Sequence, residues 1–166
     1  MKSTSSTPIA RGVSRQTKAL PQYLPASLNT IDHLDADTLV IGVCEDIRPL
    51  KGAAGFVDWR MCGEISNLIR NQSFTGQPGE ILLMSGRGRL SPVRLVLLGW
   101  GRSSNLDAEI NPRCEQLIQT VDNAASQKVA VILPEPSKSI LSTCEQVLKL
   151  GLGERLVGIF ESEGLI

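Results

Sequence analysis

The stretch that decides this fold is Lys51–Arg70, KGAAGFVDWRMCGEISNLIR, which follows the strand-like run TLVIGVC at Thr38–Cys44. That run is almost continuously apolar and rich in β-branched residues, as is typical of a strand covered on both faces. Residues 45–55 lie between the run and the first long helix; they contain one proline and two glycines, so we expect a loop there. A strand, a loop and then a helix form the repeating unit of α/β proteins.

The apolar spacing predicts a single helix over residues 56–70, with polar side chains on the opposite face. This helix would place Asp58 in its first turn and Gly63 in its middle. A glycine there costs about 1 kcal/mol relative to alanine. We therefore expect a close contact between the helix and a strand at Gly63.

The remaining elements alternate between strands and helices. Residues 25–32 predict an edge strand, and two strands at 81–84 and 94–98 are joined by a glycine- and proline-containing link of hairpin type. Further along we expect a helix over 106–125 with Pro112 in its first turn or marking a late start, a strand at 128–133, a helix over 139–150 capped by Gly151 or Gly153, and a strand at 155–160. The alternation predicts an α/β fold with a mixed, mostly parallel sheet flanked by helices.

The 166 residues suit one domain. Residues 1–31 contain four basic side chains and no carboxylate, and the first part is rich in serine and threonine. We expect a flexible N-terminal extension over 1–23 and a single domain over 24–166.

The composition argues against several partners. Seventeen basic residues balance seventeen acidic ones, so no overall field draws the protein to nucleic acid or to an anionic membrane. Aromatic residues make up only 4% of the chain, too few for a base-stacking platform. No apolar run approaches the ~20 residues of a membrane span. The four scattered cysteines predict buried, reduced thiols and a cytoplasmic location.

Candidates for catalysis and metal binding are few. The sequence has no G-x-S-x-G elbow, and His33 is the only histidine. Asp32, Asp35 and Asp37 cluster before a strand, and a solvated acidic loop explains them without a metal. We expect no catalytic residue, no metal site and no cofactor in this chain.

Two glycine-containing segments are candidates for binding a phosphate or another anion, because helix N-termini offer free N–H groups. The candidate residues are Gly52, Ala53 and Gly55 in KGAAG, and Gly99, Gly101 and Arg102 in GWGRSS. Neither segment has a complete phosphate-binding motif, and glycines also serve sharp turns. A carboxylate at Asp58 in the first helical turn would repel the anion. Turning and packing are therefore the preferred interpretation, with anion binding as the alternative.

The triplet Asp58, Trp59 and Arg60 is the candidate contact for a protein partner. Tryptophan is enriched at the energetic centres of interfaces, and the flanking charges suit a partly exposed position. The alternative is that Trp59, like Trp100, closes the core at the end of an element.

Three stretches form an ordered series of short motifs: residues 37–70, NQSFTGQPGEILLM and VRLVLLGWG. The characteristic positions of the series are Asp37, Asp58, Gly63, Phe74, Gly76, Gly79, Glu80, Gly99 and Gly101. This series resembles the N-terminal domain of the leucyl aminopeptidases.

This resemblance implies a macro-domain-like, three-layer α/β fold. In full-length members a separate C-terminal domain holds two divalent metals and performs the peptidase chemistry. The catalytic segment NTDAEGRL is absent from this chain, so no catalytic residue is carried over. The chain is expected to end where that domain would begin.

Three functions follow as hypotheses. The first is a non-catalytic domain acting in protein association or regulation, either with itself or with a peptidase partner; the alternative form of this hypothesis is a fragment of a full-length metallo-aminopeptidase. The second is a module that binds a nucleotide or an ADP-ribose-like ligand, an analogy at the level of the fold. The third is residual peptidase activity.

Overall fold

The computed structural model describes residues 22–134 and 137–161. Its strands are β1 (Gln22–Leu24), β2 (Thr38–Cys44), β3 (Ile81–Ser85), β4 (Arg94–Gly101), β5 (Val129–Ile132) and β6 (Leu156–Phe160). Its helices are α1 (Leu28–Asp32), α2 (Gly52–Arg60), α3 (Glu64–Arg70), α4 (Leu106–Asn123) and α5 (Lys138–Leu152), with 3-10 turns at Ser103–Asn105 and Gly153–Arg155.

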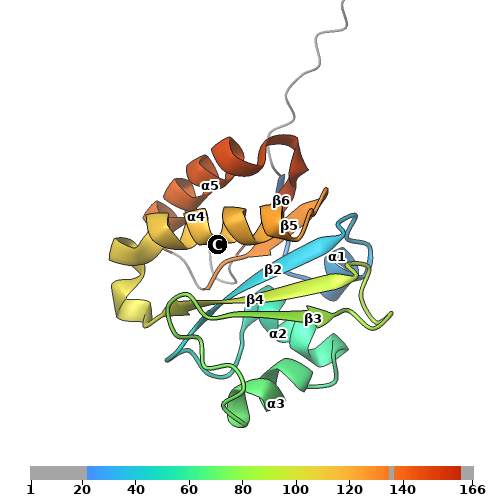
Figure 1. Cartoon of the computed structure of the whole chain (residues 1–166). Coiled ribbons are helices and arrows are strands. Elements are labelled where there is room, and N and C mark those ends of the chain that lie inside the picture. Colours follow the sequence, from blue (N-terminus) through green and yellow to red (C-terminus); the bar gives the residue numbers. More distant parts are fainter. Residues whose placement is uncertain (1–21, 135–136, 162–166) are drawn as a thin grey trace, which may run out of the picture.

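The strands form one sheet in the order β1-β6-β5-β2-β4-β3 (Figure 1). Every neighbouring pair is parallel except β3 and β4, which form the expected antiparallel hairpin. Helices α4 and α5 cover one face of the sheet, and α1, α2 and α3 lie against the other. The predicted three-layer α/β architecture with a mixed, mostly parallel sheet is confirmed.

Strand β2 lies at the centre of the sheet and is buried along its whole length. Leu39, Ile41 and Val43 point into the core beneath α2 and α3, whereas Val40 and Cys44 point into the core beneath α4 and α5. Alternate side chains of a strand face opposite sides of the sheet, so a strand that is buried on both faces carries mainly apolar side chains on both. This explains the continuous apolar run in the sequence.

The single helix predicted over residues 56–70 is wrong. Helix α2 begins earlier, at Gly52, and ends at Arg60, and α3 starts after a break at Cys62 and Gly63. Both break residues have positive φ, 58° and 76° respectively. A Cβ built on Gly63 would meet nothing within 4 Å, so the predicted helix–strand contact is also wrong. Gly63 is favoured by its left-handed backbone instead.

The beginning and the last helices also differ from the expectation. Residues 25–32 do not form an edge strand; Leu28–Asp32 form helix α1, because the Ser27 side chain accepts a hydrogen bond from the Thr30 N–H at 3.1 Å and caps the helix. The edge strand is β1, which begins at Gln22; residues 1–21 lie outside the described part. Pro112 lies inside α4 and not in its first turn. At the end of α5, Gly153 is the cap.

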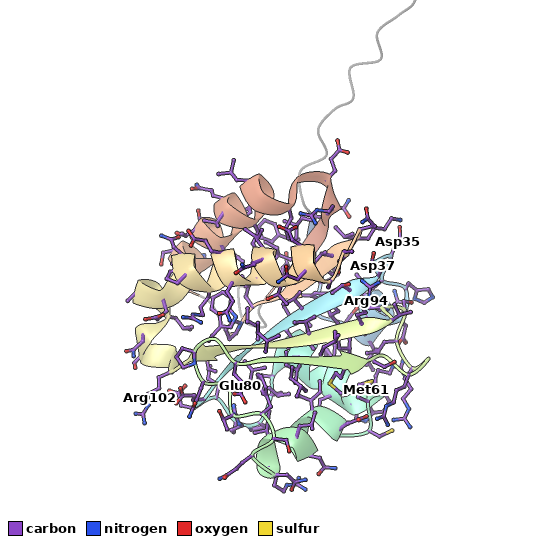
Figure 2. The ribbon with its side chains drawn as sticks, viewed as in Figure 1. Asp35, Asp37, Met61, Glu80, Arg94 and Arg102 are labelled. Atoms are coloured by element: carbon purple, nitrogen blue, oxygen red, sulfur yellow. The ribbon has the colours of Figure 1, made fainter. Side chains whose placement is uncertain are left out.

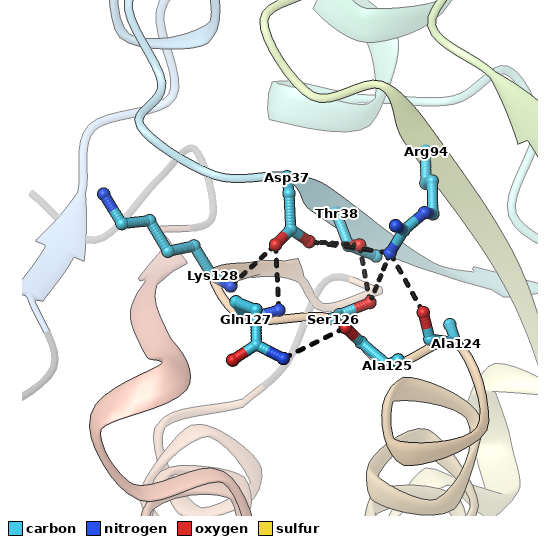
Figure 3. A network of polar contacts seen from close by, with 8 residues as sticks. All are labelled: Asp37, Thr38, Arg94, Ala124, Ala125, Ser126, Gln127 and Lys128. Atoms are coloured by element: carbon cyan, nitrogen blue, oxygen red, sulfur yellow. Dashed lines mark hydrogen bonds and ion pairs between the residues drawn. The ribbon is translucent and has the colours of Figure 1, made fainter.

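A polar network holds the amino ends of three strands together (Figure 3). The Arg94 guanidinium of β4 donates to the Ala124 carbonyl at 3.0 Å and to Ser126 Oγ at 3.3 Å. It also lies 3.9 Å from the carboxylate of Asp37, the residue before β2. A bond of 2.7 Å joins the Thr38 and Ser126 hydroxyls.

Asp37 completes this network from the strand side. Burial raises the pKa of its carboxyl, but hydrogen bonds from the Thr38 hydroxyl and from the N–H groups of Gln127 and Lys128 outweigh burial, and the pKa lies below its ordinary value. The ionised carboxylate therefore ties β2 to the segment that enters β5.

Candidate functional site

The residues singled out from the sequence lie at both ends of the sheet (Figure 2). Arg102 and Glu80 are at one end, and Asp35, Asp37 and Arg94 are at the other. Because β2 and β4 are parallel, with Cys44 in register with Gly101, their carboxyl ends meet at one edge. The KGAAG segment follows the end of β2 and GWGRSS spans the end of β4, so both lie at the edge where α/β sheets bind ligands.

A small crevice opens at this edge, between the carboxyl ends of β2 and β5 and the start of α2. Its volume is about 30 Å³, and it is lined by Gly42, Val43, Cys44, Ile47, Leu50, Lys51, Ala54, Leu133 and Pro134. At roughly 10–15 Å³ per water molecule, it has room for a few small atoms and not for a whole nucleotide.

The first turn of α2 borders the crevice without a carboxylate or a capping side chain. The expectation that Asp58 stands in the first turn is wrong, because the helix begins six residues earlier, at Gly52. Gly52 has a φ of 54°, and a Cβ on Gly55 would lie 2.9 Å from the Leu50 carbonyl oxygen. Both glycines thus have a conformational or packing role at the helix start.

The second candidate segment is covered by the loop of residues 75–80. A Cβ on Gly99 would lie only 1.9 Å from the Gln77 carbonyl oxygen, and one on Gly101 would lie 2.8 Å from the Pro78 ring. Arg102 is 72% exposed and pairs with Glu45 at 4.0 Å. None of the six candidate ligand residues lines the crevice, although Lys51 and Ala54 of the KGAAG segment do.

Glu80 fastens the covering loop. One of its carboxylate oxygens accepts hydrogen bonds from the Thr75 N–H at 2.9 Å, the Thr75 hydroxyl at 2.8 Å and the Gly76 N–H at 2.9 Å. Burial raises the pKa of this carboxyl, but the hydrogen bonds outweigh burial, and the pKa lies below its ordinary value. The glutamate is therefore ionised and holds the loop over Gly99 and Gly101.

The candidate partner residues lie on an open groove between α2 and α3, which we call the Trp59 surface. It is lined by Gly55, Asp58, Trp59, Arg60, Cys62 and Gly63. The Trp59 side chain is 64% exposed, and the Arg60 guanidinium carbon lies 5.1 Å from its ring centroid. Arg60 also forms an ion pair with Asp32 of α1. An exposed tryptophan is thereby set beside an arginine that two neighbours hold in place.

Asp58, the neighbour of Trp59, and Trp100, the second tryptophan, are both buried. The Asp58 carboxylate accepts hydrogen bonds from the N–H and the hydroxyl of Ser66, so it ties α2 to α3. Trp100 is fully buried among the side chains beneath α4 and α5. Its indole N–H finds no acceptor in the described part of the chain.

The three clustered aspartates do not converge. Asp32 pairs with Arg60, Asp35 with Lys128 at 2.6 Å, and Asp37 with the backbone of residues 127 and 128. Within residues 22–134 and 137–161, no three His, Cys, Asp or Glu side chains are placed to hold a metal ion. The described residues therefore do not fit the metal pair that the family's peptidase chemistry requires.

The four cysteines, all within the described residues, form no disulfide bond. Cys44, Cys114 and Cys144 are buried, but Cys62 is exposed at the helix break, so the expectation of four buried thiols is wrong at that position. The sulfurs of Cys114 in α4 and Cys144 in α5 lie 3.4 Å apart. This contact, together with burial, raises the pKa of the Cys144 thiol.

The sequence did not single out the crevice residues Gly42, Leu133 and Pro134. Periodicity identified β2 and β5 as strands but could not show that they are neighbours. These residues could be found only from the strand order, because parallel neighbours such as β2 and β5 end at the same edge of the sheet.

The fold defines this chain as a macrodomain-like α/β domain. It superposes on the macrodomain of Mycobacterium tuberculosis DarG with a TM-score of 0.61 at 15% identity, covering 86% of this chain and 99% of that one. It also superposes on a tomato leucine aminopeptidase mutant with a TM-score of 0.59 at 15% identity, covering 85% of this chain and 33% of that one.

Residues 40–155 match the N-terminal domain of the cytosol aminopeptidase family, and the chain belongs to this family. A probable cytosol aminopeptidase of Alkaliphilus oremlandii is 28% identical over 102 residues, which are 61% of this chain and 20% of the relative. One of Shewanella loihica is 32% identical over 98 residues, 58% of this chain and 19% of the relative. The chain thus spans about a fifth of the length of these curated relatives. In the part of the chain that the structure describes, no helix is both long and apolar enough to cross a membrane.

Proposed function

We propose that this chain is a non-catalytic domain of the cytosol aminopeptidase family that acts in the cytoplasm by binding protein, with a cytosol aminopeptidase or a second copy as its partner. The observation that supports this proposal is the Trp59 surface, where the indole of Trp59 is 64% exposed beside an ordered arginine. Large, rigid side chains with exposed apolar area supply most of the energy of protein interfaces. No metal or cofactor takes part in this proposed role.

The groups around Trp59 support binding because they are ordered before a partner arrives. Arg60 is held between the Trp59 ring and Asp32, and Asp58 is held by Ser66. A side chain that is already fixed loses less conformational entropy on binding, which otherwise costs about 0.5–1.5 kcal/mol per ordered side chain.

The test is binding of the full chain to a purified cytosol aminopeptidase, measured by biolayer interferometry. We expect Trp59→Ala to weaken binding by roughly 30-fold or more, the loss that a residue worth about 2 kcal/mol produces. The matched control is Leu150→Ala on α5, where a side chain that is 88% exposed is removed away from the groove. If the wild-type chain binds neither the aminopeptidase nor itself, the proposal is wrong. The same preparation is expected to release no leucine from a leucine anilide with added manganese.

A second candidate function is the binding of a phosphate group at the start of α2. It is favoured by one observation: the first turn of α2 borders a crevice and contains no carboxylate, so the repulsion expected from Asp58 is absent there. The crevice volume of about 30 Å³ would admit part of a nucleotide ligand at most. Isothermal titration with ADP-ribose and with inorganic phosphate tests this function, and no heat at millimolar ligand would exclude it.

A further inference from the structure

No other strand of the described residues pairs with the outer edge of β3. β3 is the last strand of the sheet, and within the described residues its only strand neighbour is β4 (Figure 1). Its five residues, Ile-Leu-Leu-Met-Ser, contain no charge and no proline. Monomeric proteins usually block such edges with charged residues, prolines or bulges, because an open edge pairs with other strands.

The edge also exposes apolar side chains. Ile81 is 45% exposed and Leu83 is 62% exposed. They point to the sheet face that α4 and α5 cover elsewhere, since Leu83 is in register with Val96 of the core beneath those helices. Leu82 and Met84 point to the opposite face and pack against the core beneath α2 and α3. Neither helical layer reaches over Ile81 and Leu83.

The direction of the free backbone groups follows from the hairpin. The Gly86 N–H donates to the Val93 carbonyl at 3.0 Å, so residue 86 is bonded to the β4 side. In an antiparallel ladder these bonds alternate, and Leu82 and Met84 therefore also bond to β4. The N–H and C=O groups of Ile81, Leu83 and Ser85 point away from the sheet.

We propose that β3 pairs antiparallel with β3 of a second copy of this chain, with Leu83 facing Leu83 across a two-fold axis; this inference names one partner of the proposed association. In this register all three outward-pointing residues are used, with Ile81 opposite Ser85 of the other copy and Leu83 opposite its equivalent. A register shifted by two residues uses only two of them. On the other face, Leu82 lies opposite Met84, so an apolar pair continues the core from one copy to the next.

The charges at the two ends of β3 favour antiparallel pairing of the two copies over parallel pairing. Glu80 stands at the amino end, where its carboxylate accepts hydrogen bonds from Thr75 and Gly76, and Arg87, which is 62% exposed and pairs with Glu64 at 3.0 Å, stands just beyond the carboxyl end. Antiparallel pairing brings the Glu80 end of one copy to the Arg87 end of the other. Parallel pairing would bring like charges together, which opposes it. The result is one continuous sheet through both copies.

The oligomeric state of the full chain tests this inference. We expect multi-angle light scattering to show a concentration-dependent rise from 17.9 kDa toward twice that mass. Leu83→Lys places a charge on the edge and should return the protein to a monomer. The matched control is Leu150→Lys on α5, which is also a change from exposed leucine to lysine and should leave the dimer intact. A wild-type chain that stays monomeric at millimolar concentration, or an unchanged dimer in Leu83→Lys, overturns the proposal.

A measurement on the wild type does not depend on the folding of a variant. Amide hydrogen exchange at Ile81, Leu83 and Ser85 should slow several-fold as the concentration rises, whereas exchange at Leu82 and Met84 is already slow and should not change. If the exchange rates of the outward-pointing and inward-pointing amides depend on concentration in the same way, the pairing is contradicted. The proposed binding of an aminopeptidase at Trp59 is a separate outcome, because Leu83→Lys leaves that surface intact.

Discussion

Gly99→Ala should destabilise this protein far more than an ordinary glycine substitution. The new Cβ would lie 1.9 Å from the Gln77 carbonyl oxygen, 2.8 Å from the Gly76 carbonyl carbon and 2.9 Å from that of Gln77. These are backbone atoms, which cannot rotate away as a side chain can. The loop of residues 75–80 must therefore move by more than an ångström.

That movement breaks several hydrogen bonds of the loop. Gly99 donates to the Glu80 carbonyl at 2.8 Å and accepts from the Gly79 N–H at 3.2 Å, and Gly101 donates to the Gly76 carbonyl at 2.9 Å. Overpacking costs about 1–3 kcal/mol, and each lost hydrogen bond about 1 kcal/mol, so we expect a loss of roughly 2–5 kcal/mol. At about 2–4 °C per kcal/mol for a chain of this size, Tm should fall by roughly 4–20 °C.

The matched control is Gly88→Ala in the hairpin link. Gly88 has a φ of 68° and open space around it, so alanine meets only the left-handed backbone penalty of about 1–2 kcal/mol. In both variants, replacing glycine by alanine lowers the conformational entropy of the unfolded chain, and this contribution cancels when their free energies of unfolding are compared. Urea unfolding followed by circular dichroism measures both. If Gly99→Ala is no less stable than Gly88→Ala, the loop does not pack as described.

Two other predictions concern Glu80 and the thiols. Glu80→Gln should lower the free energy of unfolding at neutral pH by about 1.5–3 kcal/mol, because a neutral amide replaces a carboxylate that accepts three hydrogen bonds. Since the folded-state pKa of Glu80 lies below its ordinary value of 4.5, this stabilisation is present above that value and is lost as the pH falls through the folded-state pKa. The difference in free energy of unfolding between variant and wild type, measured by urea titration, should therefore become smaller in acid. A difference that does not change with pH would contradict the role of the carboxylate. Ellman's reagent should modify one thiol, Cys62, in the native protein and the three buried thiols only after unfolding; a native chain that releases two or more equivalents at the same rate contradicts the burial of the other cysteines.

Much of the architecture could be predicted from local patterns. The continuous apolar run of β2 requires cover on both faces, and a hairpin between β3 and β4 follows from two strands joined by a glycine- and proline-containing link. The break between α2 and α3 could not be read in the same way. The apolar positions of residues 56–70 fit one helix, whereas Cys62 and Gly63 adopt a left-handed conformation that interrupts it and leaves no mark in the apolar spacing.

In the candidate site, too, local features could be predicted from the sequence and tertiary contacts could not. The sequence correctly suggested that the glycines allow turning and close packing, but it could not identify what packs on them. Gly99 is fixed by the loop that contains Gln77, more than twenty residues earlier in the chain. The exposure of Trp59 and the burial of Trp100 likewise depend on tertiary contacts, since both follow glycine-containing segments and look alike in the sequence.

The network around Arg94 has a consequence for how this domain can change. It fastens the starts of β2 and β4, the entry to β5 and the exit of α4 at one end of the molecule. The connection of residues 45–50 lies at the opposite end and is not needed for this fastening. The connection of residues 45–50 can therefore be exchanged or lengthened without breaking the Arg94 network. The loop of residues 75–80 at the same end is different, because it packs directly on Gly99 and Gly101.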